Sequence, residues 1–277
     1  MSGFTNRNEL LEKMRNGENL AWDVIVVGGG ITGAGILREA QRRGYRTLLI
    51  EQKDFSWGTS SRSSKMVHGG LRYLAAGDIK LTRESVEERQ RLLDEAPGLI
   101  DSISFYFTFR KGLFPGRLAM KVILTIYDFF AGVQDNRYCS KNELLTRFKG
   151  LQPTKLQGAS CYTDAMVDDS RLVLRVLQES IDDGGHALNY TKVKDLLLED
   201  DEVCGVRIED SEQAKCLELT APVVINATGA WADRLRNKVN KEKRIRPLRG
   251  SHIIIPKSLY PVTDVMTFLH QDDKRGV

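Results

Sequence analysis

The sequence predicts an α/β fold built around a parallel sheet, on three observations. An apolar run rich in β-branched residues at 23–27 is followed at once by the glycine-rich turn 28–33 and a helix-forming segment. A second apolar strand at 47–51 completes a strand–turn–helix–strand unit of the size of a βαβ unit. Farther along, three alternating segments with acidic turns between them predict an inserted antiparallel meander.

Composition excludes several classes of protein. The 277 residues suffice for one large or two small domains, and the net charge of +4 is too small to indicate nucleic-acid binding, so we expect none. Four well-separated cysteines without a C-x-x-C pair exclude a disulfide scaffold and a zinc ribbon and fit a reducing compartment. The four histidines lack H-x-x-x-H spacing, so we expect no metal.

The first elements follow from local signals. Residues 1–20 lack the apolar core of a signal peptide and predict a short leader helix around Leu10, Leu11 and Met14. No run of eighteen apolar residues predicts a membrane span. The helix after the glycine turn is expected at 34–43, with Gly44 as its C-cap.

The middle of the chain alternates loops and helices. Residues 52–73 are dense in Ser, Gly and Thr and predict a loop, and 78–95 predicts a charged helix stopped by Pro97. Residues 118–130 predict a helix that is apolar over most of its circumference. It is either a core helix or a membrane-interface helix assisted by nearby cations. Those cations are Arg110, Lys111, Arg117 and Lys121.

A second α/β stretch follows. Residues 168–170 can cap a helix at 171–183, which Gly184 and Gly185 end. Strands are then expected at 186–191, at 193–199, 203–209 and 215–219 for the meander, and at 223–227 for a buried strand.

The glycine turn carries the clearest chemistry. Gly28, Gly30 and Gly33 form G-x-G-x-x-G: one glycine makes the turn, one lets the backbone approach a pyrophosphate, and one lets the helix pack on the sheet. Glu51 at the end of the second strand can accept hydrogen bonds from ribose hydroxyls and opposes a 2′-phosphate. The alternative is a glycine-rich turn in a nucleotide-free domain.

The loop that follows decides between dinucleotides. A polar, small-residue loop at 59–73 (TSSRSSKMVHGGLRY) can lie along an extended dinucleotide, whereas an NAD domain normally passes into a further helix and strand. Together with VDDSRL at 167–172, NATG at 226–229 and RGSH at 249–252, this loop resembles the FAD-dependent glycerol-3-phosphate dehydrogenases. The resemblance covers roughly residues 21–277 and places the chain among the D-amino-acid oxidase-like flavoproteins.

The resemblance implies a fold and an organisation. We expect a Rossmann-like FAD-binding domain in two parts, 21–95 and 166–235, separated by a helical, substrate-side insertion at 96–165. Residues 236–277 would begin a substrate-binding domain. Family members are longer, and 274–277 ends where a further strand should start, so we expect an N-terminal portion whose own activity is open.

The resemblance also implies an activity. The family oxidises sn-glycerol 3-phosphate to dihydroxyacetone phosphate by hydride transfer from C2 to flavin N5, and the electrons pass to a quinone, or to oxygen in its oxidase branch. We expect non-covalent FAD because the loop lacks a cysteine. The alternatives are a related flavin amine or amino-acid oxidase and an inactive FAD-binding fragment.

Specific residues take roles in this picture. Arg72 and Tyr73 would face the substrate, and His252 would take the C2 hydroxyl proton. Arg72 is alternatively an ion-pairing surface residue, and His252 a strand-end histidine before a strand at 253–255. We expect His186 and His270 to be structural or exposed. The predicted cofactor-binding residues are Gly28, Gly30, Gly33, Glu51, Thr59, Ser60, Ser64, Lys65, His68, Val193 (through its backbone to adenine), Thr228 and Gly229.

A basic segment near the end of the sequence is relevant to the binding partners and the cellular location of the protein. Residues 234–249 hold eight basic side chains and one acid, which fits an anionic membrane surface, a phosphorylated substrate or a solvated face. With the helix at 118–130, it predicts a cytoplasmic protein peripherally associated with the inner face of the cell membrane, near its quinone. The sequence is also compatible with an oligomer.

Overall fold

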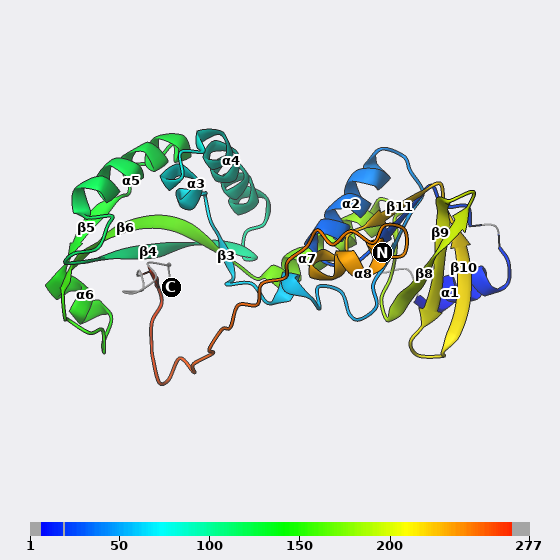
Figure 1. The fold of residues 1–277 in the computed structure, drawn as a ribbon. Coiled ribbons are helices and arrows are strands. Elements are labelled where there is room, and N and C mark those ends of the chain that lie inside the picture. The colour runs from blue at the N-terminus through cyan, green and yellow to red at the C-terminus, as the bar shows by residue number, and fades with distance from the viewer. Residues whose placement is uncertain (1–6, 19, 268–277) are drawn as a thin grey trace. The chain divides into compact units, whose positions relative to one another are not determined.

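The computed structural model describes residues 7–18 and 20–267 and divides the chain into two compact units (Figure 1). One unit comprises 1–63 and 169–251, and the other comprises 64–168 and 252–277. Residues 64–95, assigned from the sequence to the cofactor domain, therefore belong to the second unit. His270 and the chain end at 274–277 lie outside the described residues.

The first unit is built on a parallel sheet. Its strand order is β11 (Val223–Asn226), β1 (Val24–Val27), β2 (Thr47–Ile50) and β7 (His186–Leu188). Strand β7 is shorter than the predicted 186–191. Strand β11 was expected to be buried, but it is an edge strand of the described sheet, so Val223 is 47% exposed.

Two layers cover this sheet because its side chains alternate. Val24 and Val26 pack under helices α2 (Ile31–Arg42) and α7 (Asp169–Asp182). Ile25 and Val27 face the opposite core, which the leader helix and the meander close. These are α1 (Arg7–Arg15), β8 (Thr191–Glu199), β9 (Glu202–Asp210) and β10 (Lys215–Thr220). The predicted leader helix and meander are confirmed.

A buried carboxylate fastens α1 to the meander. The Asp210 side chain is 1% exposed and pairs with Arg7 and with Arg15, whose Nη2 lies 2.7 Å from Asp210 Oδ2. Burial favours a higher pKa for Asp210, but hydrogen bonds from Arg7, the Glu212 amide and Arg15 outweigh it and leave the pKa below its ordinary value. The helix is thus held by charge as well as by Leu10 and Leu11.

The second unit contains a mixed sheet that the sequence did not predict. Its order is β12 (Val265–Thr267), β4 (Ile100–Arg110), β6 (Leu156–Val167) and β3 (Met66–Val67), with β5 (Arg137–Ser140) also pairing with β6. Residues 96–165 were expected to be helical. Strand β4 packs against a core on each face, through Phe105 and Tyr106. Its apolar residues Ile103, Phe105, Phe107 and Phe109 alternate as in a strand, a pattern that the expectation of a helical insertion did not take into account.

Helices complete the second unit. Helix α4 (Ile79–Glu95), capped by Asp78, and helix α5 (Arg117–Ala131) appear as predicted. Figure 1 shows α3 (Leu71–Ala75), α4 and α5 together on one side of β4 and β6, and α6 (Lys141–Arg147) follows β5. The predicted loop 52–73 contains the short helix η1 (Thr59–Ser61), strand β3 and the beginning of α3.

Helix α5 has two apolar faces. Met120, Leu124 and Tyr127 are buried, whereas Leu118 is 77% and Phe129 is 80% exposed. The buried side agrees with the core-helix interpretation, and the membrane-interface interpretation stays a prediction. Within the described residues, no helix is both long enough and apolar enough to cross a bilayer.

The segment after β11 is mostly irregular. Helices η2 (Gly229–Trp231) and α8 (Ala232–Arg236) follow β11, and no further helix or strand appears before β12 at residue 265. The strand expected at 253–255 is not formed: Ile253 is 89% and Ile254 is 94% exposed, because no described strand pairs with them.

Candidate functional site

The glycine turn has geometric requirements at two of its three positions. Gly28 has φ +118°, and a Cβ there would lie 2.5 Å from the carbonyl oxygen of Ala227. A Cβ on Gly33 would lie 1.8 Å from the carbonyl oxygen of Gly28, so only glycine lets α2 approach the turn this closely. Gly30 is less constrained, since its Cβ would meet only the Ser60 side chain, at 3.0 Å.

The N-terminus of α2 opens beside this turn. Its N-cap, Gly30, offers no side-chain cap, and the Ile31 amide donates to Ser60 Oγ at 2.9 Å. The unsatisfied amides and the helix dipole make such an end attractive to a phosphate group. The hydrogen bond also brings η1, with Ser60, to the turn.

Glu51 is fixed at the carboxyl end of β2. Its Oε2 accepts from the Gly29 amide at 2.8 Å, and its Oε1 accepts from the Lys53 amide at 2.9 Å. These two amide hydrogen bonds hold the Glu51 carboxylate beside the glycine turn, where it lines a cleft.

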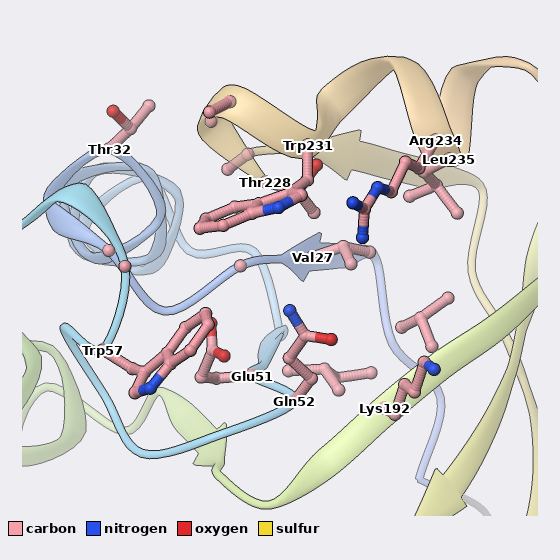
Figure 2. Close-up of a pocket in the computed structure, with 18 of the residues that line it drawn as sticks. Val27, Thr32, Glu51, Gln52, Trp57, Lys192, Thr228, Trp231, Arg234 and Leu235 are labelled. Carbon is pink, nitrogen blue, oxygen red and sulfur yellow. The ribbon is translucent and has the colours of Figure 1, made fainter. Parts of the chain in front are cut away.

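That cleft has a volume of about 550 Å³ and lies in the first unit. The structure gathers most of the predicted cofactor residues of this unit around it, and Figure 2 shows Glu51 and Thr228 among its walls. The predicted residues that line it are Gly28, Gly30, Glu51, Thr59, Ser60, Val193, Thr228 and Gly229. Gly33 does not line the cleft, because it packs beneath the turn.

Four basic side chains that were not predicted as site residues line this cleft: Lys192, Lys194, Arg234 and Lys238. Lys194 pairs with Glu209, and Lys238 pairs with Asp195. Lys192 and Arg234 line it on the side away from Trp57 (Figure 2), and neither has an ion-pair partner within the described part of the chain. Lys192 is next to Val193, and Arg234 begins the basic run that the sequence connected with a membrane or phosphate. Their charges complement an anionic ligand.

Two tryptophans were also missed. The rings of Trp57 and Trp231 line the cleft and stack with centroids 5.7 Å apart and planes inclined by 30°. The Arg62 guanidinium lies 4.9 Å from the Trp57 ring centroid. A Cβ on Gly58 would come within 3.1 Å of the Trp231 ring. The only sequence signal was the position of Trp231 just after Thr228 and Gly229.

The remaining predicted residues lie in the second unit. They are Ser64, Lys65, His68, Arg72, Tyr73 and His252. Arg72 is exposed and Tyr73 is 44% exposed at the start of α3, and Arg72 has no ion-pair partner among residues 7–18 and 20–267. His252 is exposed in the irregular segment after α8. Their roles stay predictions.

Comparison with known proteins assigns the family. The family model for FAD dependent oxidoreductases matches residues 23–277. The chain belongs to this family. It is 34% identical, over its whole length, to the aerobic glycerol-3-phosphate dehydrogenase of Staphylococcus haemolyticus strain JCSC1435, of which it covers half. It is 36% identical to that of Bacillus subtilis strain 168, over 89% of this chain and 45% of the relative.

Solved structures agree with the family assignment. The glycerol-3-phosphate dehydrogenase of Bacillus halodurans complexed with FAD matches the whole chain and 48% of its own, with a TM-score of 0.74 and 27% identity. L-Proline dehydrogenase of P. horikoshii shares the fold, with a TM-score of 0.65 and 19% identity over 92% of this chain and 68% of its own. The chain spans about half the length of the curated relatives it matches. The predicted flavoprotein fold is confirmed.

Proposed function

We propose that the chain provides the FAD-binding part of a glycerol-3-phosphate dehydrogenase, which oxidises sn-glycerol 3-phosphate to dihydroxyacetone phosphate. The observation that carries the proposal is the cleft at the uncapped N-terminus of α2, with Glu51 on one wall and Lys192 and Arg234 on the other. The aerobic glycerol-3-phosphate dehydrogenases to which the chain is similar support the choice of substrate.

The residues present fit FAD. A Cβ on Gly30 would stand in the cleft beside Ser60, so glycine keeps this space free for a pyrophosphate at the amides of α2. Glu51 would accept from ribose hydroxyls, and the backbone of Val193 would meet the adenine. Lys192 and Arg234 would balance phosphate charge. A bound flavin would supply the hydride acceptor, at its N5, and a quinone would receive the electrons.

The second unit would supply the substrate side. The Arg72 guanidinium is unpaired within the described residues and would hold the substrate phosphate or steady negative charge on its oxygen, beside Tyr73. His252 would accept the C2 hydroxyl proton. Thr59, Ser60, Ser64, Lys65 and His68 would line the flavin through hydroxyl, amine, imidazole and backbone groups.

Peripheral binding to the inner face of the cell membrane completes the proposal. Leu118, Val122 and Phe129 form an exposed apolar face on α5. The charged side chains of 110–134 are basic except for Asp128, which is buried. Such a helix suits an anionic bilayer interface, where a quinone is accessible. The basic run 234–249 adds charge of the same sign.

A spectrum of the purified protein tests the proposal. We expect a flavin absorption band, which acid denaturation separates from the polypeptide as free FAD. Glycerol 3-phosphate added without oxygen should bleach this band. Bleaching by an amino acid instead would favour an amino-acid oxidase, whereas bound flavin that no substrate reduces would favour an FAD-binding fragment. Flavin that stays with the denatured chain would refute non-covalent binding.

A further inference from the structure

A buried carboxylate in the second unit has no part in the proposed reaction. Asp164 on β6 has a side chain that is 1% exposed. Its Oδ1 accepts from Arg89 Nη1 at 2.8 Å, from the Gly69 amide at 3.0 Å and from the Tyr127 hydroxyl at 3.2 Å. Its Oδ2 lies 3.3 Å from Nδ1 of His68. One carboxylate therefore joins α4, α5 and the loop after β3.

The negative charge of Asp164 is balanced by the positive charge of Arg89. Arg89, on α4, has a side chain only 5% exposed, and its Nη1 also donates to the Tyr127 hydroxyl at 2.8 Å. Burial, followed by the negative charge of Asp164, raises the pKa of Tyr127 far above its ordinary value. The hydroxyl thus keeps its proton and can donate it to Asp164. Removing one member would leave buried partners unsatisfied, which is costly.

Strand register places His68 against this group. Val67 of β3 pairs with Ala165 of the antiparallel strand β6. Continuing this register by one residue brings His68, just after β3, next to Asp164 on β6. The imidazole meets the Phe105 ring edge-on, with centroids 5.6 Å apart, and is about half exposed. An Nδ1–H donated to the carboxylate leaves Nε2 as the acceptor nitrogen.

Gly69 and Gly70 allow the turn after β3 to lie close to Tyr127 and Tyr73. A Cβ on Gly69 would lie 2.0 Å from the Tyr127 hydroxyl. Gly70 has φ +85° and would place a Cβ 3.0 Å from Tyr73 Cδ2. Helix α3 begins directly after it, and the Tyr73 amide donates to the Gly70 carbonyl at 2.8 Å. The position of Arg72 and Tyr73 is therefore set by the turn that Asp164 holds.

We propose that Asp164 is a positioning residue, whose carboxylate fixes the His68 imidazole and the Gly69 amide and thereby orients Arg72 and Tyr73. The proposal rests on the proposed function in so far as Arg72 and Tyr73 serve the substrate. Arg89 and Tyr127 keep the carboxylate in place. His68 in this arrangement presents Nε2 as an acceptor.

The substitution Asp164→Asn tests the imidazole contact. Three donors converge on Oδ1, so the asparagine oxygen should take that place and turn its NH₂ toward His68. His68 Nδ1 must then become an acceptor, and the ring should change from the Nδ1–H to the Nε2–H tautomer. ¹⁵N-histidine NMR of the flavin-loaded protein in mildly alkaline buffer reports this, with His68→Gln assigning the signal.

Kinetics test the consequence for the substrate side. We expect kcat/KM for glycerol 3-phosphate, per bound flavin, to fall roughly 10- to 100-fold in Asp164→Asn, as for a misplaced substrate contact. Flavin content should stay unchanged. Asp101→Asn is the matched control, because Asp101 lies on β4 of the same sheet and is exposed. It should change neither the tautomer nor kcat/KM.

The outcomes separate this proposal from the function. A wild-type His68 in the Nε2–H form, or an Asp164→Asn protein with unchanged kcat/KM, would overturn the positioning role. If Asp164→Asn does not fold, the tautomer of His68 in the wild-type protein and the variant Tyr127→Phe test the role instead. Tyr127→Phe removes one hydrogen-bond donor to Asp164, so it should shift the NMR signal of the Gly69 amide and lower kcat/KM. No change in either quantity would overturn the role. A wild-type protein that ignores glycerol 3-phosphate but holds His68 as Nδ1–H would refute the substrate and leave the imidazole contact standing.

Discussion

Ser60 Oγ lies 3.0 Å from the point that a Cβ on Gly30 would occupy, so a side chain at Gly30 would enter the cleft. We expect Gly30→Val to abolish FAD binding while the circular dichroism spectrum stays close to wild type. Gly35→Val is the control, because a Cβ at Gly35, also in α2, meets nothing within 4 Å. Normal flavin occupancy in Gly30→Val would show that the pyrophosphate binds elsewhere.

Arg234 tests whether the cleft recognises phosphate charge. Arg234→Met should raise the Kd for FAD roughly 10- to 100-fold, as expected for one lost charge-assisted hydrogen bond. Arg249→Met removes a charge from the same basic run at an exposed position outside the cleft, and it should leave the Kd within twofold. Titration of flavin fluorescence measures both. Equal effects of the two variants would indicate only a diffuse electrostatic attraction.

Arg72→Lys tests the substrate side. Lysine keeps the positive charge but loses the planar guanidinium, so kcat/KM for glycerol 3-phosphate should fall by about 30- to 1,000-fold with a nearly unchanged flavin spectrum. Arg83→Lys, at an exposed pair with Glu87 on α4, serves as the control. Activity must be divided by bound flavin. An unchanged value per flavin would remove Arg72 from the site.

The exposed face of α5 makes the membrane proposal specific. Flotation with anionic vesicles should recover the protein at low salt and lose it at 1 M salt, where the Debye length is about 3 Å. Replacing Leu118 and Phe129 by serine should weaken this binding at least about tenfold, since two large apolar side chains no longer enter the interface. The control is Ile79→Ser, which replaces an exposed apolar residue on α4 and should leave vesicle binding unchanged. Equal binding to neutral vesicles would argue against the electrostatic part.

Asp210 gives the fold a pH dependence. Its pKa is lower in the folded chain than in the unfolded chain, so its ionised form stabilises the fold above the unfolded pKa. That stabilisation disappears as the pH falls through the lower, folded value. Asp210→Asn should lower the free energy of unfolding by about 3 kcal/mol at pH 7. Urea unfolding at several pH values should show the difference shrinking below about pH 4.

Glu212→Gln is the control for that change. Glu212 pairs with Arg7 but is 57% exposed, so its loss should cost less than about 1 kcal/mol. If the stability difference between wild type and Asp210→Asn is constant from pH 7 to pH 3, the ionised carboxylate is not what fastens α1.

The first unit was predictable because its signals are local. The apolar strands, the glycine turn and Glu51 are continuous in sequence, so the sheet, the meander and most of the cleft followed from them. Lys192 and Trp57 could not be assigned, because which side chains reach the cleft depends on strands far apart in the chain. Nothing in the sequence distinguished Arg234 from the other basic residues of 234–249.

The mixed sheet of the second unit was not predicted, for a different reason. Strands β4 and β6 pair over almost their whole lengths, but α5, β5 and α6 lie between them in the sequence, so no turn signal joins them. The alternation of Ile103, Phe105, Phe107 and Phe109 is typical of a strand, yet it does not show which strand pairs with β4. The strand expected at 253–255 has the right composition but lacks a pairing partner among the described strands. The roles of Ser64, Lys65, His68, Arg72, Tyr73 and His252 still depend on the resemblance.

The division of the first unit into 1–63 and 169–251 has a consequence for folding during synthesis. Strands β1 and β2 leave the ribosome early, yet the β7 and β9 residues that bury Ile25 and Ile50 are translated only after the whole segment 64–168. At 5–20 residues per second, that segment takes roughly 5–20 s to make. During this interval the cofactor sheet exposes apolar strands that chaperones can bind, whereas β4 and β6 can pair as soon as they emerge.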